Sequence, residues 1–375
     1  MLDKNTKLKV LEYEVLGQLP DLFTFNDGTE VKAKEDWEKR RKELYDLAVV
    51  LQYGDLPEPE FLEVEPLFPD NPGTYKIHTG RKDHPVSFTM YYFAPPKSKN
   101  TPVIVDGDLC FSYPFNKDFL NAAKDKGISW AWFNRTELAH DVQHEGFKGQ
   151  LYECYPEYKF GAIRAWAWGY SRCVDALIKL DLIDKDCITF TGHSRGGKTA
   201  MLAGVLDKRA AIVAPNETCQ GSCSCYRVHM AGESQDGTVI HSETLDKLIG
   251  NFDFWLNPDF LKYRHDEVNI PFDSHFLKAM VAPRTLFVSE AVHDIWANPI
   301  GSWQTTMAAT EAFKFLGVKD NIFWYFRDGS HRHDVLDVQM LVNLICHKKW
   351  GEPLNEYFFR RPFDEYPPIY RKLED

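Results

Sequence analysis

The sequence predicts a three-layer α/β/α sandwich with a mostly parallel central sheet. From about residue 100 to residue 330, short apolar segments rich in β-branched and aromatic residues alternate with longer helix-like segments. This alternation is typical of βαβ units, in which helices cover both faces of a parallel sheet. A hydrophobic content of 44% over 375 residues is sufficient for one large core.

The chain begins with a charged, helix-prone stretch, and we expect residues 1–75 to form an N-terminal extension packed on the main body. Within it, residues 35–54 have the pattern of an amphipathic helix that Gly54 ends. No repeat, low-complexity tract or flexible linker divides the chain, so residues 1–375 are expected to form one domain.

The strands and helices of the main body follow in a regular order. A β-hairpin leads into the first buried strand, and strands then alternate with helices. Strands are expected at 74–80, 86–95, 102–107, 128–133, 187–192, 210–215, 285–290 and 322–329, and helices at 160–181, 197–206 and 303–316.

Composition excludes several classes of partner. A formal net charge of -11 repels nucleic acid and anionic membranes, so neither is expected as a partner. An aromatic content of 14%, with ten Trp, favours a carbohydrate ligand, because aromatic rings stack on sugar rings.

The sequence as written has no signal peptide and no run of eighteen apolar residues. We therefore expect a cytoplasmic monomer, with secretion through a signal peptide absent from this sequence as the alternative.

Three of the eight cysteines, Cys219, Cys223 and Cys225, crowd into one short segment. A tetrahedral metal site requires paired CxxC-type spacings, which are not evident here, so we expect reduced thiols and no metal or other cofactor. A disulfide within this segment is the alternative for an exported protein.

A GxSxG motif marks the candidate nucleophile. Residues 192–196 lie between a predicted strand and a predicted helix, which is the context of the nucleophile elbow in the α/β-hydrolase fold. We therefore expect Ser194 to be a nucleophile, whereas the alternative is a tight turn in which it only caps the helix. The backbone N–H of Arg195 would then stabilise an oxyanion, and its guanidinium could add a charged donor.

The base and the acid are expected after later strands. In this fold the triad has the chain order serine, acid, histidine, with the histidine after the last strand. His331 and His333 both follow that strand, and His331 is favoured because it comes first after the turn, with His333 as a surface neighbour. Glu217 and Asp294 each follow a strand, and the pattern leaves both open as the acid.

Several segments resemble one known family. GHSRGGKTA at 192–200 is similar to the motif G-C/H-S-R-x-G-K of the glucuronoyl esterases of carbohydrate esterase family fifteen. APNETCQGSCSCYR falls at the same distance as that family's P-Q-E-S-G-x-G-G-x-x-C-W-R. Further matches, within about 155–350, are GAIRAWAWGYSRCVDAL, AGESQ at 231–235, IPFDSHFLKAMVAPR and HDIWANPIG.

The resemblance implies roles for several residues. Arg195 matches the family's oxyanion-stabilising arginine, and Lys198, Glu233 and Trp296 match contacts to the sugar. Without the resemblance, these three would be a helix-surface lysine, a solvated glutamate and a core tryptophan. Members of the family take the triad acid from either of these two strand ends, so Glu217 and Asp294 could share the role. The spacing from Ser194 favours Glu217 as the acid with the larger effect on catalysis.

The chain also departs from the family pattern. Thr218-Cys219 replaces Ser-Gly after the acid, and His193 replaces the cysteine that forms a disulfide next to the nucleophile in fungal members.

The resemblance implies a serine esterase acting on esters of 4-O-methyl-glucuronic acid, in glucuronoxylan or in lignin–carbohydrate linkages. The expected ligand is a glucuronate ester or a glucuronoxylan oligosaccharide. An acetyl esterase for acetylated xylan oligosaccharides is the alternative within the same chemistry. A non-catalytic carbohydrate-binding relative is the alternative of another class.

Overall fold

A computed structural model describes residues 8–68, 70, 73–96, 98–234 and 236–373. The last residue of the AGESQ segment therefore lies outside the described residues. Within the described part of the chain, no helix combines the length and apolar character needed to cross a membrane.

Nine strands of the described residues form the main sheet. In chain order they are β2 (Phe61–Pro66), β3 (Thr74–Gly80), β4 (Pro85–Phe93), β5 (Thr101–Asp106), β6 (Ser129–Phe133), β7 (Ile183–His193), β8 (Ala210–Asn216), β11 (Thr285–Ala291) and β12 (Ile322–Arg327). Their spatial order is β12-β11-β8-β7-β5-β6-β4-β3-β2. The strands from β12 to β6 are parallel, and β4, β3 and β2 extend the sheet in antiparallel pairing.

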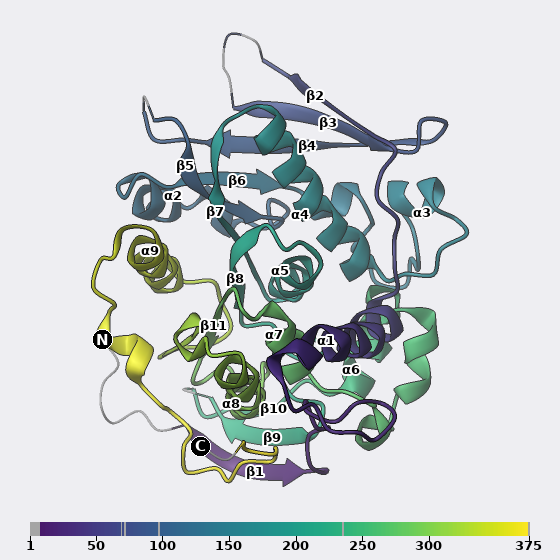
Figure 1. Ribbon diagram of the computed structural model, residues 1–375, viewed down its shortest axis with the longest axis vertical. Coiled ribbons are helices and arrows are strands. Elements are labelled where there is room, and N and C mark those ends of the chain that lie inside the picture. Colours follow the sequence, from purple (N-terminus) through teal and green to yellow (C-terminus); the bar gives the residue numbers. More distant parts are fainter. Residues whose placement is uncertain (1–7, 69, 71–72, 97, 235, 374–375) are drawn as a thin grey trace.

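Helices cover both faces of this sheet (Figure 1). One face carries α4 (Ala162–Lys179), α5 (Arg195–Leu206), α7 (His275–Val281) and α8 (Pro299–Phe315), and the other carries α2 (Lys117–Lys124) and α9 (Val335–Trp350). The α/β-hydrolase architecture with a mostly parallel sheet is therefore confirmed. Two further helices, α3 (Gln150–Cys154) and α6 (Leu245–Phe252), belong to the connections between strands.

A smaller sheet lies at one end of the molecule. It has the order β1-β9-β10, built from β1 (Lys9–Val15), β9 (Val228–Glu233) and β10 (Val239–His241) in antiparallel pairing. These three strands were not predicted. β1 is mostly exposed and β10 has only three residues, so their sequences lack the strong apolar pattern of the central strands.

The predicted N-terminal helix forms in three pieces. A 3₁₀ turn (Lys34–Asp36) leads into α1 (Trp37–Tyr45), and a π-helical segment, η2 (Asp46–Leu51), follows it. Gly54 then ends the helix in the left-handed region at φ +83°. An added Cβ there would lie 2.1 Å from the carbonyl oxygen of Lys159, so the position accepts only glycine.

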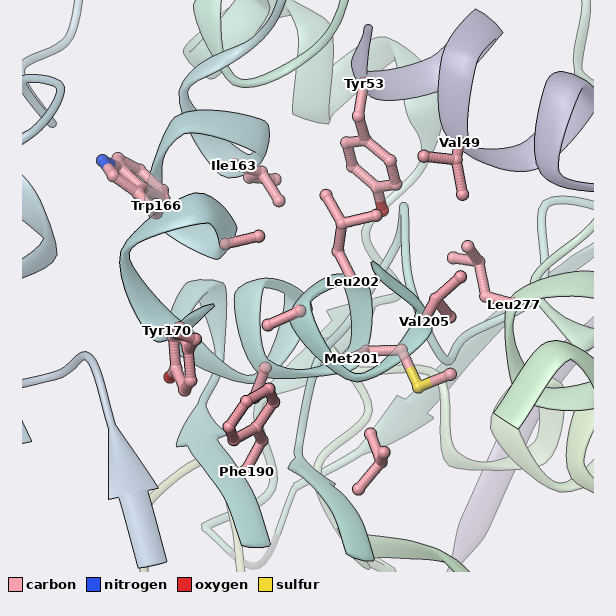
Figure 2. Packing of buried hydrophobic residues seen from close by; sticks show 14 of the residues in the cluster. Val49, Tyr53, Ile163, Trp166, Tyr170, Phe190, Met201, Leu202, Val205 and Leu277 are labelled. Carbon is pink, nitrogen blue, oxygen red and sulfur yellow. The ribbon is translucent and has the colours of Figure 1, made fainter. Parts of the chain in front are cut away.

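The central strands are buried on both faces, as the continuous apolar runs predict. In β5, Val103 and Val105 pack beneath the α4 and α5 layer, whereas Ile104 packs beneath the α2 and α9 layer. Figure 2 shows the first of these layers, where Tyr53 of the N-terminal segment belongs to the same apolar cluster as Leu202 of α5. The N-terminal segment therefore packs directly on the helix that follows the GxSxG motif.

All eight cysteines lie in the described part of the chain, each as a free thiol. Only Cys110 is an exposed residue. Neighbouring protein groups partly shield its thiol from water, and this desolvation raises the pKa of the thiol to about 11, which slows its reaction at neutral pH. We expect at most one thiol to react with a disulfide reagent in the native protein, and all eight after unfolding without reductant. Fewer than eight after unfolding would mean a disulfide or a bound metal, with Cys219, Cys223 and Cys225 as the first candidates.

Candidate active site

The carboxyl ends of four neighbouring parallel strands bring the predicted triad together. Ser194 follows β7, Glu217 follows β8, Asp294 follows β11 and His331 follows β12. Because the order across the sheet is β7-β8-β11-β12, these four residues meet at one edge although they are far apart in the sequence.

The backbone at Ser194 has the sharp turn of a nucleophile elbow. Its φ and ψ are 56° and -119°, which few non-glycine residues adopt. The turn has no room for a side chain at Gly196, since a Cβ there would lie 1.9 Å from the Asp108 carboxylate. Ser194 precedes the first residue of α5, so the N–H of Arg195 belongs to the first turn, where N–H groups have no intrahelical acceptor.

A buried carboxylate, Asp108, braces the elbow from the strand β5 side. Its Oδ2 accepts from the backbone N–H of His193 at 2.8 Å and from the hydroxyl of Tyr113. Its Oδ1 accepts from the guanidinium of Arg135. Burial raises the pKa of Asp108, and Arg135 acts in the opposite direction. The elbow is therefore fixed by a charge-assisted network as well as by its own turn.

His331 contacts the serine on one side and a carboxylate on the other. Its Nε2 lies 3.0 Å from Ser194 Oγ, and its Nδ1 lies 2.6 Å from Asp294 Oδ2. The imidazole side chain is 33% exposed, so a ligand can reach it. This is the hydrogen-bond order of a serine, a base and an acid that orients the base.

Glu217 also lies near His331, but other groups hold its carboxylate. Its Oε2 is 3.4 Å from His331 Nδ1 and accepts from the backbone N–H of Arg332 at 2.7 Å. Its Oε1 accepts from the buried guanidinium of Arg327. Burial, reinforced by Asp294, raises the pKa of Glu217 well above its usual value, whereas Arg327 acts to lower it.

The family spacing favoured Glu217 as the triad acid, whereas the geometry favours Asp294. Asp294 makes the short bond to His331, and its Oδ1 accepts from the backbone N–H of Ala297 at 3.2 Å. Glu217 stands farther from the imidazole because Arg327 and the backbone at Arg332 draw its carboxylate to the loop that carries His331.

His333 is not the surface neighbour that the sequence suggested. Its ring packs edge-on against Tyr113 and Phe119 and lies parallel to His193, with centroids 5.7 Å apart. Burial lowers the pKa of His333 well below its usual value, and it lowers that of His193 to about 3, with a smaller effect of His331. Both rings are therefore neutral near pH 7. The Nδ1 of His193 lies 2.7 Å from Asn216 Oδ1, to which it is hydrogen-bonded.

The guanidinium of Arg195 is held in place by three groups. Its Nη1 donates to Asp141 Oδ2 at 3.1 Å. Its Cζ lies 4.9 Å from the centroid of Phe252 and 4.7 Å from that of Trp255, and these two rings stack on one another. The side chain remains 28% exposed.

Two predicted sugar contacts have other partners. Lys198 is 2% exposed, and its ammonium donates to the carbonyl oxygens of Thr218 and Gln220 and to Glu243. Its three N–H groups therefore have three protein acceptors, and they support the loop after β8. Glu233, at the end of β9, forms an ion pair with Lys9 and lies outside the cavity next to His331.

Trp296, the third residue predicted as a sugar contact, lies beside the triad. It lines a cavity of about 460 Å³ together with Asp294 and His331. The other lining residues have hydroxyl, carboxylate, imidazole or apolar side chains, namely Ser234, Asp236, Thr238, Ile240, His293, Ile295 and Ser330. Hydroxyl groups beside an indole face suit a sugar ring, which offers both polar edges and an apolar face.

Reasoning from the sequence missed Arg327, Asp108 and Asp141. Arg327 is 1% exposed and donates to Glu217, Asp337 and the carbonyl oxygen of Ser330. Its signal in the sequence is its place at the end of the last strand, directly before the turn to His331, where a charged residue ends an apolar run.

One group in the described part of the chain has the spacing of a metal site. Ligand atoms of His193, Glu217 and His331 lie within 4.8 Å of one another. Glu217 is already bound to Arg327, and the Nε2 of His331 is bound to Ser194. The triad itself accounts for this clustering.

Comparisons with known proteins point to one family. A family model described as fungal glucuronyl esterases matches residues 77–317. Two 4-O-methyl-glucuronoyl methylesterases are similar in sequence: that of Podospora anserina is 31% identical over 85% of this chain and 64% of its own length, and that of Hypocrea jecorina is 33% identical over 84% and 66%. The chain thus spans just under two thirds of the length of these two curated relatives.

A solved structure agrees with the sequence comparison. The carbohydrate esterase family 15 glucuronoyl esterase from Caldicellulosiruptor kristjansonii matches with a TM-score of 0.85 and 32% sequence identity, over 96% of this chain and 97% of that one.

Proposed function

This chain belongs to the glucuronyl esterase family, and on that basis we propose that it hydrolyses esters of 4-O-methyl-glucuronic acid through an acyl-enzyme on Ser194. The observation that supports this most directly is the unbroken chain of contacts from Ser194 Oγ to His331 Nε2 and from His331 Nδ1 to Asp294 Oδ2. It opens beside a cavity whose lining suits a sugar.

In the proposed mechanism, His331 Nε2 removes the proton from Ser194 Oγ as that oxygen attacks the ester carbonyl carbon. The backbone N–H of Arg195 and its guanidinium stabilise the oxyanion of the tetrahedral intermediate. His331 then delivers the proton to the departing alcohol oxygen, which leaves the uronoyl group on Ser194. Water attacks this acyl-enzyme by the same steps, and the free uronic acid departs.

Asp294 is the acid that we propose for the triad. Its carboxylate accepts the Nδ1–H of His331, which fixes the tautomer with a lone pair on Nε2 and stabilises the imidazolium as it forms. Glu217 would add a second negative charge at 3.4 Å, and its main bonds secure the loop on which His331 stands.

Sugar recognition is proposed for the Trp296 face of the cavity. The indole is partly exposed there, and Lys247 lies over the ring at 5.3 Å. We propose that Lys198 acts indirectly, by holding the loop after β8, rather than as a direct sugar contact.

Replacing Arg195 with alanine is expected to lower kcat by about two orders of magnitude while changing KM much less, because an oxyanion donor acts mainly in the transition state. Steady-state kinetics on methyl 4-O-methyl-glucuronate measures both constants. A change in KM alone would make Arg195 a substrate-binding residue and would remove it from the mechanism.

A substrate panel tests the proposed function itself. Methyl, allyl and benzyl glucuronates are compared with p-nitrophenyl acetate and an acetylated xylan oligosaccharide. The proposal expects the glucuronates to have the highest kcat/KM. Faster turnover of the acetylated substrates would favour the acetyl esterase alternative, and no turnover of any ester would favour a binding protein.

A further inference from the structure

A chain of alternating charges runs from the nucleophile elbow to Arg195. Its centre is Arg135, which is fully buried. The guanidinium of Arg135 donates to Asp108 Oδ1 on one side, and its Nη2 lies 3.5 Å from Asp141 Oδ2 on the other. The rings of Phe111 and Trp166 lie 4.9 Å from the Arg135 Cζ. Two carboxylates and two aromatic rings therefore enclose the Arg135 guanidinium.

Asp141 contacts groups from three different segments of the chain: it accepts hydrogen bonds from Arg195 and Trp255 and forms an ion pair with Arg135. Its Oδ2 is 3.1 Å from Arg195 Nη1 and 3.5 Å from Arg135 Nη2. Its Oδ1 accepts from the indole N–H of Trp255 at 3.0 Å. With 9% of its side chain exposed, Asp141 is better shielded from water than an ordinary surface carboxylate. Its bond to Arg195 is correspondingly stronger than an exposed ion pair.

Within this charge network, Arg195 has the side chain whose position depends most on its neighbours. It is the first residue of α5, so its long side chain leaves the helix beside Ser194, and 28% of that side chain is open to solvent. An arginine of this kind samples several rotamers unless a partner selects one. Asp141 supplies the hydrogen bond, and the stacked Phe252 and Trp255 rings supply the flat surface.

The same network reaches the serine from the opposite direction. Asp108 holds the backbone N–H of His193, the residue next to the nucleophile, at 2.8 Å. Asp108 and Asp141 share Arg135, so the turn that presents Ser194 and the Arg195 side chain are tied to one buried cation.

We propose that Asp141 is a positioning residue for the Arg195 guanidinium, and that Arg135 joins it to the Asp108 brace so that one ion network aligns nucleophile and oxyanion donor. The inference rests on the oxyanion role proposed for Arg195. It assigns function to two residues, Arg135 and Asp141, that do not line the cavity beside His331.

The sharpest variant is Asp141→Asn. It keeps the shape and one acceptor oxygen, but it places an amide NH₂ where a second carboxylate oxygen stood, so either Arg195 or Trp255 loses its acceptor. Arg135 is unsuitable as the first target, because its removal would leave the buried Asp108 without its main counter-charge.

A double-mutant cycle of Asp141→Asn with Arg195→Met tests the proposal. If Asp141 acts through Arg195, Asp141→Asn alone lowers kcat by about 10-fold to 100-fold with little change in KM, and it has no further effect when Arg195→Met is already present. Independent, additive losses would mean that Asp141 only stabilises the fold, and the proposal would be overturned.

Asp55→Asn is a control for the loss of an aspartate–arginine ion pair away from the site. Asp55 also pairs at 3.0 Å with a nearly buried arginine, Arg164, but it lines a different cavity. It should leave kcat unchanged, which separates positioning from the general loss of an ion pair. Each variant is first checked by thermal unfolding. If Asp141→Asn unfolds, Asp141→Glu, which keeps the charge on a longer side chain, replaces it in the cycle, and additivity there would equally overturn the proposal.

The cycle is run with two readouts so that the two proposals fail separately. The first is hydrolysis of methyl 4-O-methyl-glucuronate, and the second is the rate at which a fluorophosphonate labels Ser194, a reaction that also builds charge on an oxygen at the oxyanion site. Coupling in the labelling rate without glucuronate hydrolysis would reject the proposed substrate and retain the positioning role. Glucuronate hydrolysis without coupling in either readout would retain the proposed substrate and reject the positioning role of Asp141.

Discussion

Ser194→Ala is expected to lower kcat by about six orders of magnitude, the loss seen when a catalytic-triad nucleophile is removed. The change deletes a single oxygen atom. Alanine accepts the elbow's φ of 56° no worse than serine does, and the braces at Asp108 remain in place. The unfolding temperature should therefore stay close to that of the parent protein. Hydrolysis of methyl 4-O-methyl-glucuronate and a thermal melt give the two measurements.

Contaminating esterase is the main risk in that measurement, so a preparation from cells carrying an empty vector sets the background. Turnover well above this background in the alanine variant would rule out an acyl-enzyme on Ser194. Labelling by a fluorophosphonate in the parent and its loss in the variant would confirm the site independently of substrate.

Asp294→Asn is expected to lower kcat by about four orders of magnitude, because the amide can present its N–H to His331 and hold the wrong tautomer. Glu217→Gln should reduce kcat far less, since the carboxylate is 3.4 Å from the imidazole and bonded elsewhere. Its larger effect should fall on stability, because Arg327 would lose a buried counter-charge. Kinetics and thermal melts on both single variants and the double variant separate the two effects.

Equal losses of kcat in the two single variants would mean that the acids share the work. A larger loss for Glu217→Gln, with the fold intact, would return the main role to Glu217 as the family spacing favoured. In either case the distance from Asp294 to His331 would be a poor guide to function in this site.

Prediction from the sequence succeeded where a short stretch of residues is enough to determine the local structure. The alternation of apolar strands and helices predicted the parallel sheet, because strands buried on both faces must be apolar throughout. The GxSxG motif predicted the elbow, because its glycines are dictated by contacts within the turn and with Asp108. The chain order of the strand ends then brought Asp294 and His331 to the same edge.

The sequence was least informative where partners come from distant segments. Lys198 has the spacing of a sugar contact, but three acceptors from residues 218–243 surround its ammonium. Asp141 looks like an ordinary loop carboxylate until the fold brings Arg135, Arg195 and Trp255 to it. The choice between two acids depended on a fraction of an ångström set by Arg327, which no spacing along the chain encodes.

The carbonyl oxygen of Gly221 accepts hydrogen bonds from both Gln52 and Tyr53, so the N-terminal helix is tied to the loop that begins at Glu217. This has a practical consequence for anyone shortening the protein for expression or engineering. A fragment that starts after Gly54 would lose both donors and strip the cover from the apolar cluster around Leu202. The shortest useful version of this protein therefore has to begin before α1, and tags or fusion partners belong upstream of that helix.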